Sequence, residues 1–401
     1  MRVLMVGWEL PPKISGGLGV ACYGMTKGLY ELGEVEVTFL IPHAATCEDD
    51  RFVQLNALGL SKVETTAVPN SSSYGNNLFS QVDDYADKMS EFARKDGQWD
   101  VIHAHDWLTV PAALELKRIT GKPLVLHIHS TEYDRSGPNA SAVIIDIEQQ
   151  GLDAADSIVA VSNYTRDILV DRYRQNPQKV AVIYNAIDEV SEPLSRDSSM
   201  DRLVNVAFLG RITYQKGPGY FIEAASIALR MRPGLRFVMG GDGDLLCQMK
   251  KLAIDRGIAE YLYFPGFLKG DEARHLLRNS EIYVMPSVSE PFGISALEAI
   301  QEGAVVIASC QSGVAEVVTN LVTFEYWDVD TLASKIVCLH DDISRMQMMK
   351  IDARREILGL TWTKAARQLR EIYRRVLDGQ ADGYTRGINY RSDEMFDEIC
   401  C

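Results

Sequence analysis

The sequence has little of what membrane-spanning or nucleic-acid-binding proteins need. No apolar run approaches the ~18 residues of a membrane-spanning helix. Positive charge is scarce, since 41 Lys and Arg residues stand against 55 Asp and Glu residues and the formal net charge is −14. A general nucleic-acid binder shows a basic surface. We therefore expect no transmembrane segment and no nucleic-acid partner.

The amino terminus and the cysteines also lack the marks of secretion. Met1 and Arg2 lead straight into Val3–Val6, without the longer apolar region and cleavage site of a signal peptide. The seven cysteines form no C-x-x-C pair, which is typical of reduced thiols. The terminal Cys400 and Cys401 follow an acidic stretch, which does not favour lipidation. We expect a cytoplasmic protein, and the oligomeric state stays open.

The sequence does have the composition and pattern of an α/β protein. Its 401 residues, 46% hydrophobic and 24% charged, suit two folded domains. Short β-branched apolar runs alternate with amphipathic stretches, which predicts parallel sheets built from βα units. Strands are expected at Val3–Val6, Val35–Ile41, Val101–His103, Leu124–Ile128, Ser157–Val161, Lys179–Ile183, Asn205–Leu209, Arg236–Met239, Tyr261–Phe264, Ile282–Met285 and Val305–Ala308. Helices are expected at Gly19–Leu32, Gln81–Lys95, Pro111–Thr120, Gly217–Met231, Leu245–Arg256, Glu272–Arg278, Ser295–Gln301 and Thr363–Leu377.

The periodic pattern is lost at Glu189–Arg202, where we place a linker. The prediction is two Rossmann-like, doubly wound domains facing a cleft, the first over residues 1–195 and the second over 196–362. We expect the helix at about 363–377 to pack back on the first domain and the tail 379–401 to be poorly ordered. Such folds bind ligands where the carboxyl ends of their strands face the cleft.

A glycine-rich turn with Gly16, Gly17 and Gly19 lies between the first strand and the first helix. Glycines let the backbone approach a phosphate, whose charge the helix amino terminus favours. The spacing is neither G-x-G-x-x-G nor a P-loop. A simple tight turn explains these glycines equally well.

Two cations, Arg211 and Lys216, follow the strand that opens the second half of the chain and precede a helix. From there they can converge on one diphosphate, Arg as a planar fork and Lys as a point charge. Isolated surface cations are the alternative.

A run from Glu290 to Glu298 follows the strand expected at Ile282–Met285. Glu290 falls in a loop, where a carboxylate can accept hydrogen bonds from sugar hydroxyls. The amides of Gly293–Ser295 open the next helix and suit an anion. Glu298 lies one turn further and can reach a ribose, unless it is an ordinary first-turn acid.

Histidines form two H-x-H pairs, His103 with His105 and His127 with His129. Residues two apart on a strand share one face, so the pairs raise the possibility of a metal site. The metallohydrolase pattern H-x-H-x-D-H is absent, because Asp106 directly follows His105. We interpret these residues as polar groups at the carboxyl ends of two strands facing the cleft, and expect no metal.

Taken together, these residues resemble the GT-B nucleotide-sugar glycosyltransferases of family 4, which are retaining enzymes, and within them a glycogen- and starch-synthase-like group. The similarity runs from Met1 to about Leu377. The segments that carry it are Ser15–Gly19, Asp100–Trp107, Leu124–His129, Asn185–Asp188, Gly210–Gly217, Glu290–Glu298 and Gly313–Glu316.

The resemblance assigns roles by position. Arg211 and Lys216 look like the pair that neutralises the donor diphosphate and stabilises the leaving nucleotide. Glu290 looks like the acid that holds the donor sugar, and Glu298 like the ribose ligand. The other assignments are Gly16 and Gly17 at the phosphate, Phe292, Gly293 and Ile294 bordering the donor, His129 beside the donor sugar and Asp106 on the acceptor side.

The resemblance implies a metal-independent hexosyltransferase that uses a UDP-, ADP- or GDP-sugar and no cofactor. Its expected donor sugar is glucose and its expected acceptor an α-glucan, as in glycogen biosynthesis. One alternative is a transferase of surface-polysaccharide or glycolipid synthesis. Another is a sugar-nucleotide epimerase or hydrolase on the same fold.

Overall fold

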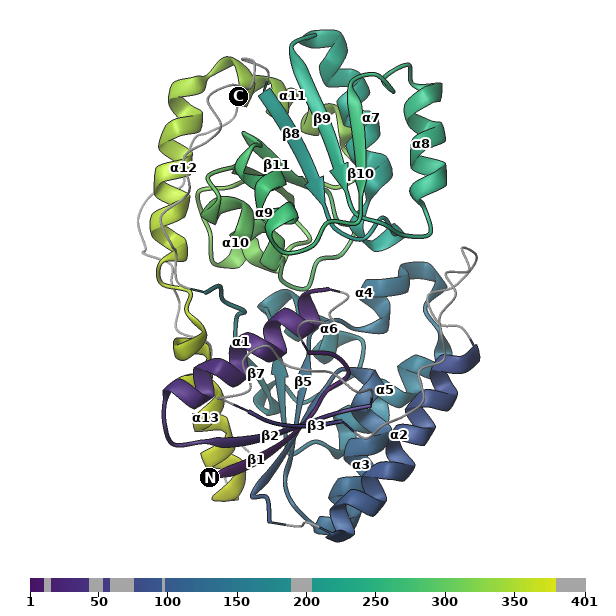
Figure 1. Cartoon of the computed structure of the whole chain (residues 1–401), viewed down its shortest axis with the longest axis vertical. Coiled ribbons are helices and arrows are strands. Elements are labelled where there is room, and N and C mark those ends of the chain that lie inside the picture. The colour runs from purple at the N-terminus through teal and green to yellow at the C-terminus, as the bar shows by residue number, and fades with distance from the viewer. Residues whose placement is uncertain (11–15, 43–52, 58–75, 96–97, 189–203, 380–401) are drawn as a thin grey trace.

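A computed structural model describes residues 1–10, 16–42, 53–57, 76–95, 98–188 and 204–379. It contains two sheets, one above the other along the long axis (Figure 1). The strand order is β3-β2-β1-β4-β5-β6-β7 in the first and β10-β9-β8-β11-β12-β13 in the second. All paired strands are parallel. In each sheet the chain begins in the middle and winds to both edges, so the expected fold class is confirmed.

The first domain has helices on both faces of its sheet, because alternate residues of a strand point to opposite sides. Val3 and Met5 of β1 pack with α1 and α13, whereas Leu4 and Val6 pack with α2 and α3. The elements of this domain are β1 (Arg2–Val6), α1 (Gly17–Glu31), β2 (Glu36–Ile41), β3 (Gln54–Ala57), α2 (Asn76–Lys95), β4 (Val101–His105), η1 (Trp107–Thr109), α3 (Val110–Thr120), β5 (Leu124–Ile128), α4 (Glu132–Ser136), η2 (Gly137–Asn139), α5 (Ala142–Ala154), β6 (Ser157–Ala160), α6 (Asn163–Asp171), η3 (Pro177–Lys179) and β7 (Val180–Val182).

The second domain repeats this arrangement. Val206 and Phe208 of β8 pack with α7 and α11, whereas Ala207 joins the apolar cluster of α1 and α13 through α10. One apolar cluster therefore continues from one domain into the other. The elements are β8 (Val204–Leu209), η4 (Tyr214–Lys216), α7 (Pro218–Met231), β9 (Leu235–Gly240), α8 (Leu246–Asp255), β10 (Leu262–Gly266), α9 (Asp271–Arg278), β11 (Ile282–Met285), α10 (Ile294–Gln301), β12 (Val305–Ser309), η5 (Gly313–Glu316), β13 (Val322–Phe324), α11 (Val329–Asp341), α12 (Ile343–Ile357) and α13 (Trp362–Leu377).

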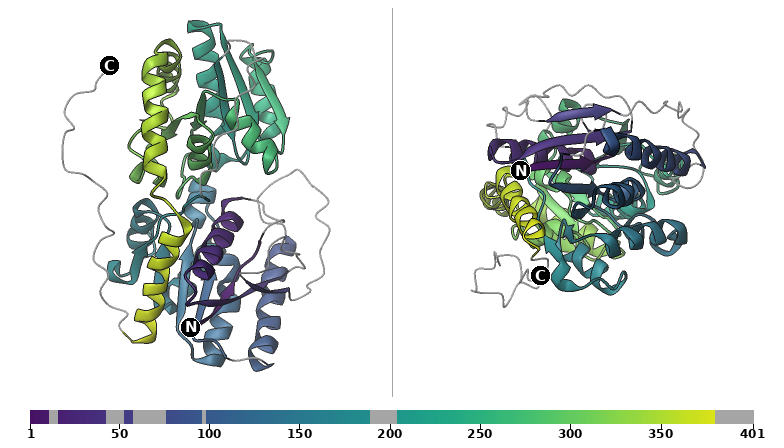
Figure 2. Two further views of the ribbon diagram at one scale, coloured as in Figure 1. Left: turned by 60° about the vertical axis from the view of Figure 1, so that its left-hand side comes forward. Right: turned by 90° about the horizontal axis from the view of Figure 1, so that it is seen from below.

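The last helix crosses back to the first domain, where α13 lies beside α1 (Figure 2). The two helices approach closely at glycines of α1. A Cβ on Gly28 would lie 2.5 Å from the carbonyl oxygen of Trp362, and one on Gly24 would overlap the Trp362 ring. Glu34 pairs with Arg370 and Arg374 at 2.9 and 2.6 Å.

The sequence analysis missed the strands β3 and β13 and the helices α4, α5, α6, α11 and α12. The two strands have four and three residues, too few for an alternating pattern to show. In α12 the apolar residues Ile343, Met348 and Ile351 are exposed, so no apolar face stands out. The expected linker and all but Gly379 of the expected tail lie outside the described residues. None of the described helices is both long and apolar enough to cross a bilayer.

Candidate active site

The loops that follow the carboxyl ends of the strands in the two sheets meet between the domains. Gly17 begins α1 and Ile294 begins α10, and a Cβ on Gly17 would lie 3.8 Å from Ile294 Cδ1. The amino termini of two helices, each the positive end of a dipole, are therefore neighbours. Gly16, the N-cap of α1, and Gly293, the N-cap of α10, flank this point. The structure thus brings together two loops that are far apart in the sequence.

Lys216 and Glu290 form an ion pair at the edge of the second sheet. The Lys216 ammonium lies 2.6 Å from Glu290 Oε2, which also accepts a hydrogen bond from the Ser287 hydroxyl at 3.0 Å. The Glu290 backbone is fixed as well, since its N–H donates to the Gln311 carbonyl at 2.8 Å. Glu290 is buried and Lys216 partly so. A carboxylate and a cation are therefore held side by side.

Arg211 lies in the same loop as Lys216 but has a different partner. Its side chain is exposed, and Nη2 donates to Gln215 Oε1 at 3.4 Å. Gln215 is buried, and its own amide nitrogen donates to the Ser289 carbonyl at 3.2 Å. The two predicted diphosphate ligands thus share one loop, with Arg211 at the surface and Lys216 engaged by Glu290.

The backbone next to Glu290 adopts a conformation that suits glycine. Gly293 has φ of +105°, and a Cβ there would come within 2.8 Å of Met285 Cε. Phe292 is buried, with its ring centroid 6.2 Å from that of Tyr184 in the first domain. These contacts set the position from which the α10 amides begin.

Glu298 lies on α10 and is largely covered. Burial raises the pKa of its carboxyl from 4.5 to about 7, and nearby Glu302 adds to that rise, while Arg274 opposes it. A carboxyl that titrates near neutral pH suits a ligand-binding group. It remains one turn from the α10 amino terminus, as expected for the predicted ribose ligand.

Asp106 and His129 lie together at the edge of the first sheet. Asp106 Oδ1 accepts from the backbone N–H groups of His129 at 2.6 Å and Ser130 at 3.3 Å. Its φ of +56° is unusual for a residue with a side chain and indicates local strain. Burial raises its pKa to about 7, whereas Arg135 and the two amides lower it. The predicted acceptor-side acid therefore also shapes the turn that carries His129.

The prediction that the histidines face the cleft is wrong for His103, His105 and His127. All three are fully buried on the face of the sheet that α1 and α13 cover. β4 also runs two residues beyond its expected end, which leaves His103 in mid-strand. Burial lowers the pKa of all four, to about 3 for His103 and His129, so all are neutral. Tyr373 and His103 Nδ1 share a 2.6 Å hydrogen bond. Five of the eight ring nitrogens have no partner among the described residues, a cost that packing must offset.

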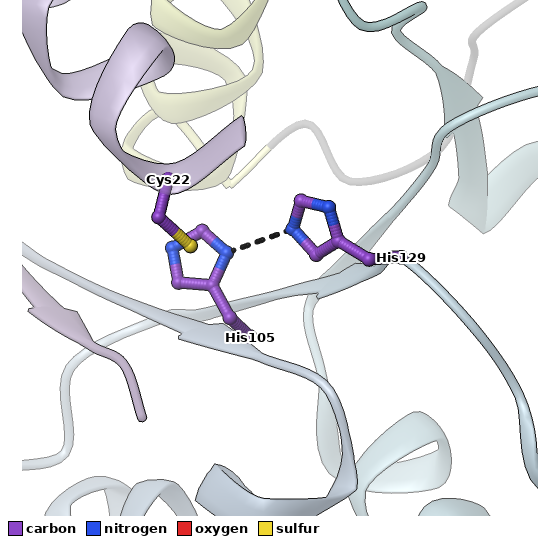
Figure 3. Close-up of side chains that lie close together, drawn as sticks. All are labelled: Cys22, His105 and His129. Carbon is purple, nitrogen blue, oxygen red and sulfur yellow. Dashed lines mark hydrogen bonds between the residues drawn. The ribbon is translucent and has the colours of Figure 1, made fainter. Parts of the chain in front are cut away.

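Two groups of these side chains have ligand atoms within 4.8 Å of one another: Cys22, His105 and His129, and His103, His105 and His127. In the first group His105 Nδ1 and His129 Nε2 already share a 3.1 Å hydrogen bond, which an ion would have to replace (Figure 3). In the second, the rings of His103 and His127 are within 9° of parallel, so their lone pairs do not converge. Neither arrangement matches tetrahedral zinc, and the absence of a metal site stays a prediction.

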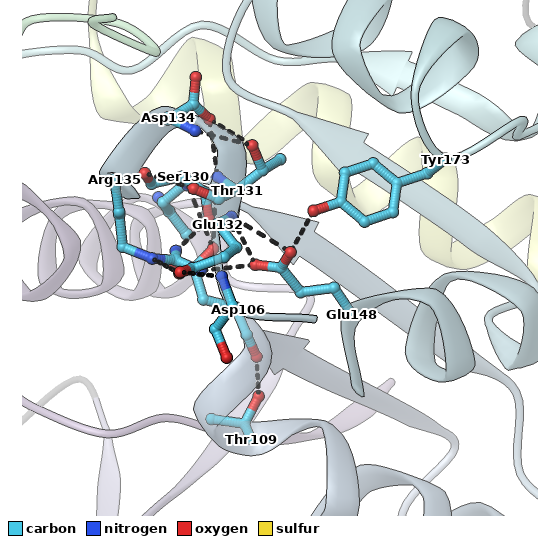
Figure 4. A network of polar contacts seen from close by, with 11 residues as sticks. Asp106, Thr109, Ser130, Thr131, Glu132, Asp134, Arg135, Glu148 and Tyr173 are labelled. Carbon is cyan, nitrogen blue, oxygen red and sulfur yellow. Dashed lines mark hydrogen bonds and ion pairs between the residues drawn. The ribbon is translucent and has the colours of Figure 1, made fainter. Parts of the chain in front are cut away.

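The sequence analysis missed the polar network behind the His129 turn (Figure 4). Thr131 caps α4, and Asp134 completes the capping box by accepting from the N–H and hydroxyl of Thr131 at 2.7 and 2.8 Å. Arg135 donates to the Ser130 carbonyl and to Glu148, both at 2.6 Å. The T-x-x-D spacing is a capping signal that could have located α4. The same spacing does not reveal that Asp134 also contacts Ser289 in the other domain.

Two Rossmann-like domains with facing strand ends, and a carboxylate–ammonium pair at the strand ends of the second, form a GT-B architecture. Comparison with known proteins agrees with it. Residues 15–190 match the family model Glycosyltransferase Family 4, and residues 199–356 match Glycosyl transferases group 1. The chain belongs to the family 4 glycosyltransferases.

Individual relatives cover most of the chain. A glycosyltransferase of Methanocaldococcus jannaschii without a characterised activity is 30% identical over 80% of this chain and 83% of its own. The glycogen synthase of Mycobacterium tuberculosis is 27% identical over 93% of this chain and 94% of its own. The solved structure of Anabaena HepE in complex with UDP-glucose has a TM-score of 0.72 at 17% identity, covering 92% and 98% of the two chains. That likeness establishes the shared fold.

Proposed function

We propose that this glycosyltransferase is a retaining hexosyltransferase that moves glucose from a nucleoside-diphosphate sugar to an α-glucan. The observation that carries the proposal is the Lys216–Glu290 pair, held at the strand ends of the second sheet. From the first domain, the α1 amino terminus lies beside Ile294, and Asp134, five residues after His129, accepts a hydrogen bond from Ser289. The glycogen synthase of M. tuberculosis, similar along nearly the whole chain, supports the acceptor class.

In this proposal the second domain holds the nucleotide. Glu298 accepts hydrogen bonds from the ribose, and Arg211 and Lys216 face the diphosphate. The amino termini of α1 and α10 add backbone amides and dipole charge on the same anion. These groups stabilise the negative charge that develops on the leaving diphosphate, so the reaction needs no metal ion.

Glu290 then holds hydroxyls of the donor sugar, with His129 on the opposite side. His129 is neutral, so it can hydrogen-bond the sugar without placing a charge beside the cationic centre that forms at C1, and the buried, neutral His105 supports its ring through a 3.1 Å hydrogen bond. We infer a same-face substitution, in which the leaving phosphate oxygen takes the proton of the acceptor hydroxyl. Asp106 lies on the acceptor side.

A panel of UDP-, ADP- and GDP-sugars tests the function, with nucleotide release measured in the presence of glycogen, maltooligosaccharide or no acceptor. We expect release from a glucose donor that depends on a glucan, with the glucan extended. Release without any acceptor would indicate a hydrolase. Transfer to lipid-linked acceptors but not to glucans would overturn the acceptor assignment, and loss of activity with a chelator would overturn metal independence.

A further inference from the structure

Ser289, the residue before Glu290, is held by the other domain. Its hydroxyl donates to Asp134 Oδ1, and the Tyr164 hydroxyl lies 3.0 Å from Ser289 Oγ. Because the single Ser289 proton points to the carboxylate, Tyr164 donates to Ser289. Asp134 and Ser289 are both buried. We name this three-residue contact the Ser289 clasp.

The first-domain side of the clasp is rigid (Figure 4). Asp134 Oδ2 is fixed by the N–H and hydroxyl of Thr131, whose hydroxyl in turn accepts from the Asp134 N–H at 3.3 Å. This capping box begins α4, three residues after His129. Arg135, bound to the Ser130 carbonyl and Glu148, holds the turn from behind. The carboxylate of Asp134 therefore marks a fixed point relative to His129.

The second-domain side leads directly to Glu290. The Ser289 carbonyl accepts from Gln215 at 3.2 Å, and the Val288 N–H donates to the Gln215 carbonyl at 2.9 Å. The loop is thus tied to its own domain through its backbone, while the Ser289 side chain is tied to the first domain. If the domains move apart, the loop keeps its backbone hydrogen bonds to Gln215 and loses only the contact of the Ser289 side chain with the first domain.

We propose that Asp134 is a positioning residue that aligns Glu290 for the donor sugar through Ser289, across the contact between the two domains. The proposal rests on the proposed role of Glu290 at the donor sugar. Neither Asp134 nor Ser289 reaches a reacting atom in this scheme. The proposed nucleotide ligands of the second domain, Arg211, Lys216 and Glu298, are not members of the clasp.

The test compares wild type with Ser289→Ala and Asp134→Asn, and uses Asp146→Asn on the exposed face of α5 as the matched control. Calorimetry measures the Kd for UDP, or for the nucleoside diphosphate that the donor panel selects. Steady-state kinetics gives kcat, and hydrogen exchange reports the Glu290 amide. Because misplacement by about 1 Å costs on the order of 100-fold in rate, we expect kcat to fall by about 10- to 100-fold in both clasp variants. The Kd stays within about twofold, and Glu290 exchange becomes faster.

Wild-type kcat in Ser289→Ala, or a Kd that worsens in parallel with kcat, would overturn the proposal. If Asp134→Asn fails to fold because α4 loses its cap, Ser289→Ala decides alone, since it leaves that cap intact. If the wild type transfers no sugar, the proposed function fails on its own. Hydrogen exchange then tests the clasp by itself, and equal exchange rates of the Glu290 amide in wild type and Ser289→Ala would contradict it.

Discussion

Lys216 and Glu290 neutralise each other before any donor arrives, with 2.6 Å between ammonium and carboxylate. A diphosphate must therefore share Lys216 with a carboxylate of the same sign as itself. In the proposed function this competition weakens nucleotide binding, while Glu290 serves the sugar hydroxyls. Diphosphate binding by Lys216 and sugar binding by Glu290 are therefore two separate functions of one ion pair, and a variant can affect them in opposite directions.

The Glu290→Gln variant tests that separation. Removing the competing charge frees Lys216, so we expect a nucleoside diphosphate without sugar to bind about 3- to 10-fold more tightly, a gain of the order of a partly exposed ion pair. Sugar transfer falls at the same time. Calorimetry with UDP and a turnover assay measure the two effects, with Glu223→Gln on α7 as the control. Weaker UDP binding by Glu290→Gln would show that Glu290 does not compete for Lys216.

Glu298 predicts a pH dependence of nucleotide binding. Its pKa of about 7 leaves it protonated in mild acid, and a carboxylate accepts ribose hydroxyls better than a carboxyl does. Affinity should therefore rise as pH increases through 7, and Glu298→Gln should bind more weakly and lose this dependence. The Kd for UDP at about pH 6 and about pH 8 measures it. A pH-independent wild-type Kd would argue against the ribose role.

The same group affects the stability of the ligand-free protein in the opposite sense. Because the folded pKa lies above the ordinary value of 4.5, the folded state binds the proton more tightly than the unfolded state. Stability is therefore lost as pH rises from about 4.5 to about 7, and Glu298→Gln should reduce this loss. Thermal unfolding over that range provides the check.

Arg211 is exposed and has a weak partner, so its removal should not disturb the fold. By comparison with other charge-stabilising groups, Arg211→Ala should lose about 2–4 kcal/mol of transition-state stabilisation. The kcat/KM ratio measures this loss. Arg232→Ala, which breaks an exposed pair with Asp341 on the second domain, is the control. Near-normal turnover in Arg211→Ala would refute the diphosphate assignment.

At the scale of elements, the buried central strands are predictable and the edges are not. The expected bounds of β5 and β11 agree with the structure at both ends, because both are fully buried runs of apolar or histidine residues. The edge strands β3 and β13 are too short for a pattern. The cations of α13 include Arg370 and Arg374, which pair with Glu34. Periodicity identifies a polar face but not what lies opposite it.

The packing of α1 on α13 predicts a strong effect at Gly28. The Trp362 carbonyl, 2.5 Å from a Cβ there, belongs to the backbone and cannot turn away. Gly28→Ala should therefore destabilise the fold by about 1–3 kcal/mol, as overpacking does. Gly219→Ala in the first turn of α7, where no neighbouring atom lies within 4 Å, should instead stabilise by up to about 1 kcal/mol. Denaturant unfolding of both distinguishes a steric effect from helix propensity.

At the scale of the molecule, the candidate site is predictable only in its local parts. Arg211, Lys216 and Glu290 stand at strand ends, so their position relative to the strands already indicates a binding edge. The residues that they contact are brought to them only by the tertiary fold. Asp134 and Ser289 are 155 residues apart, and the positive φ of Asp106 depends on tertiary contacts. No pattern within one segment encodes such contacts.

A second contact between the domains lies at Glu316 of η5. Its Oε1 accepts from the Tyr164 N–H, and Oε2 from the Asn163 N–H, both at 2.8 Å, so a second-domain carboxylate caps the amino terminus of α6 in the first domain. The Tyr184 hydroxyl adds a bond of 3.0 Å. Negative charge at a helix amino terminus is stabilising, and hydrogen bonds to charged groups contribute about 1.5–3 kcal/mol each. This contact therefore favours the arrangement that the site requires.

The Glu316→Gln variant removes the charge and one amide acceptor, so the domains should separate more readily. We expect faster hydrogen exchange at the amides of Asn163 and Tyr164, a larger radius of gyration by small-angle X-ray scattering, and a higher KM for the donor. Asp342→Asn is the matched control, because Asp342 caps α12 within the second domain. It should lower thermal stability without changing exchange at α6. If Glu316→Gln leaves α6 exchange and the scattering curve unchanged, the carboxylate does not hold the domains together, and the closed arrangement must depend on the Ser289 clasp and the shared apolar cluster.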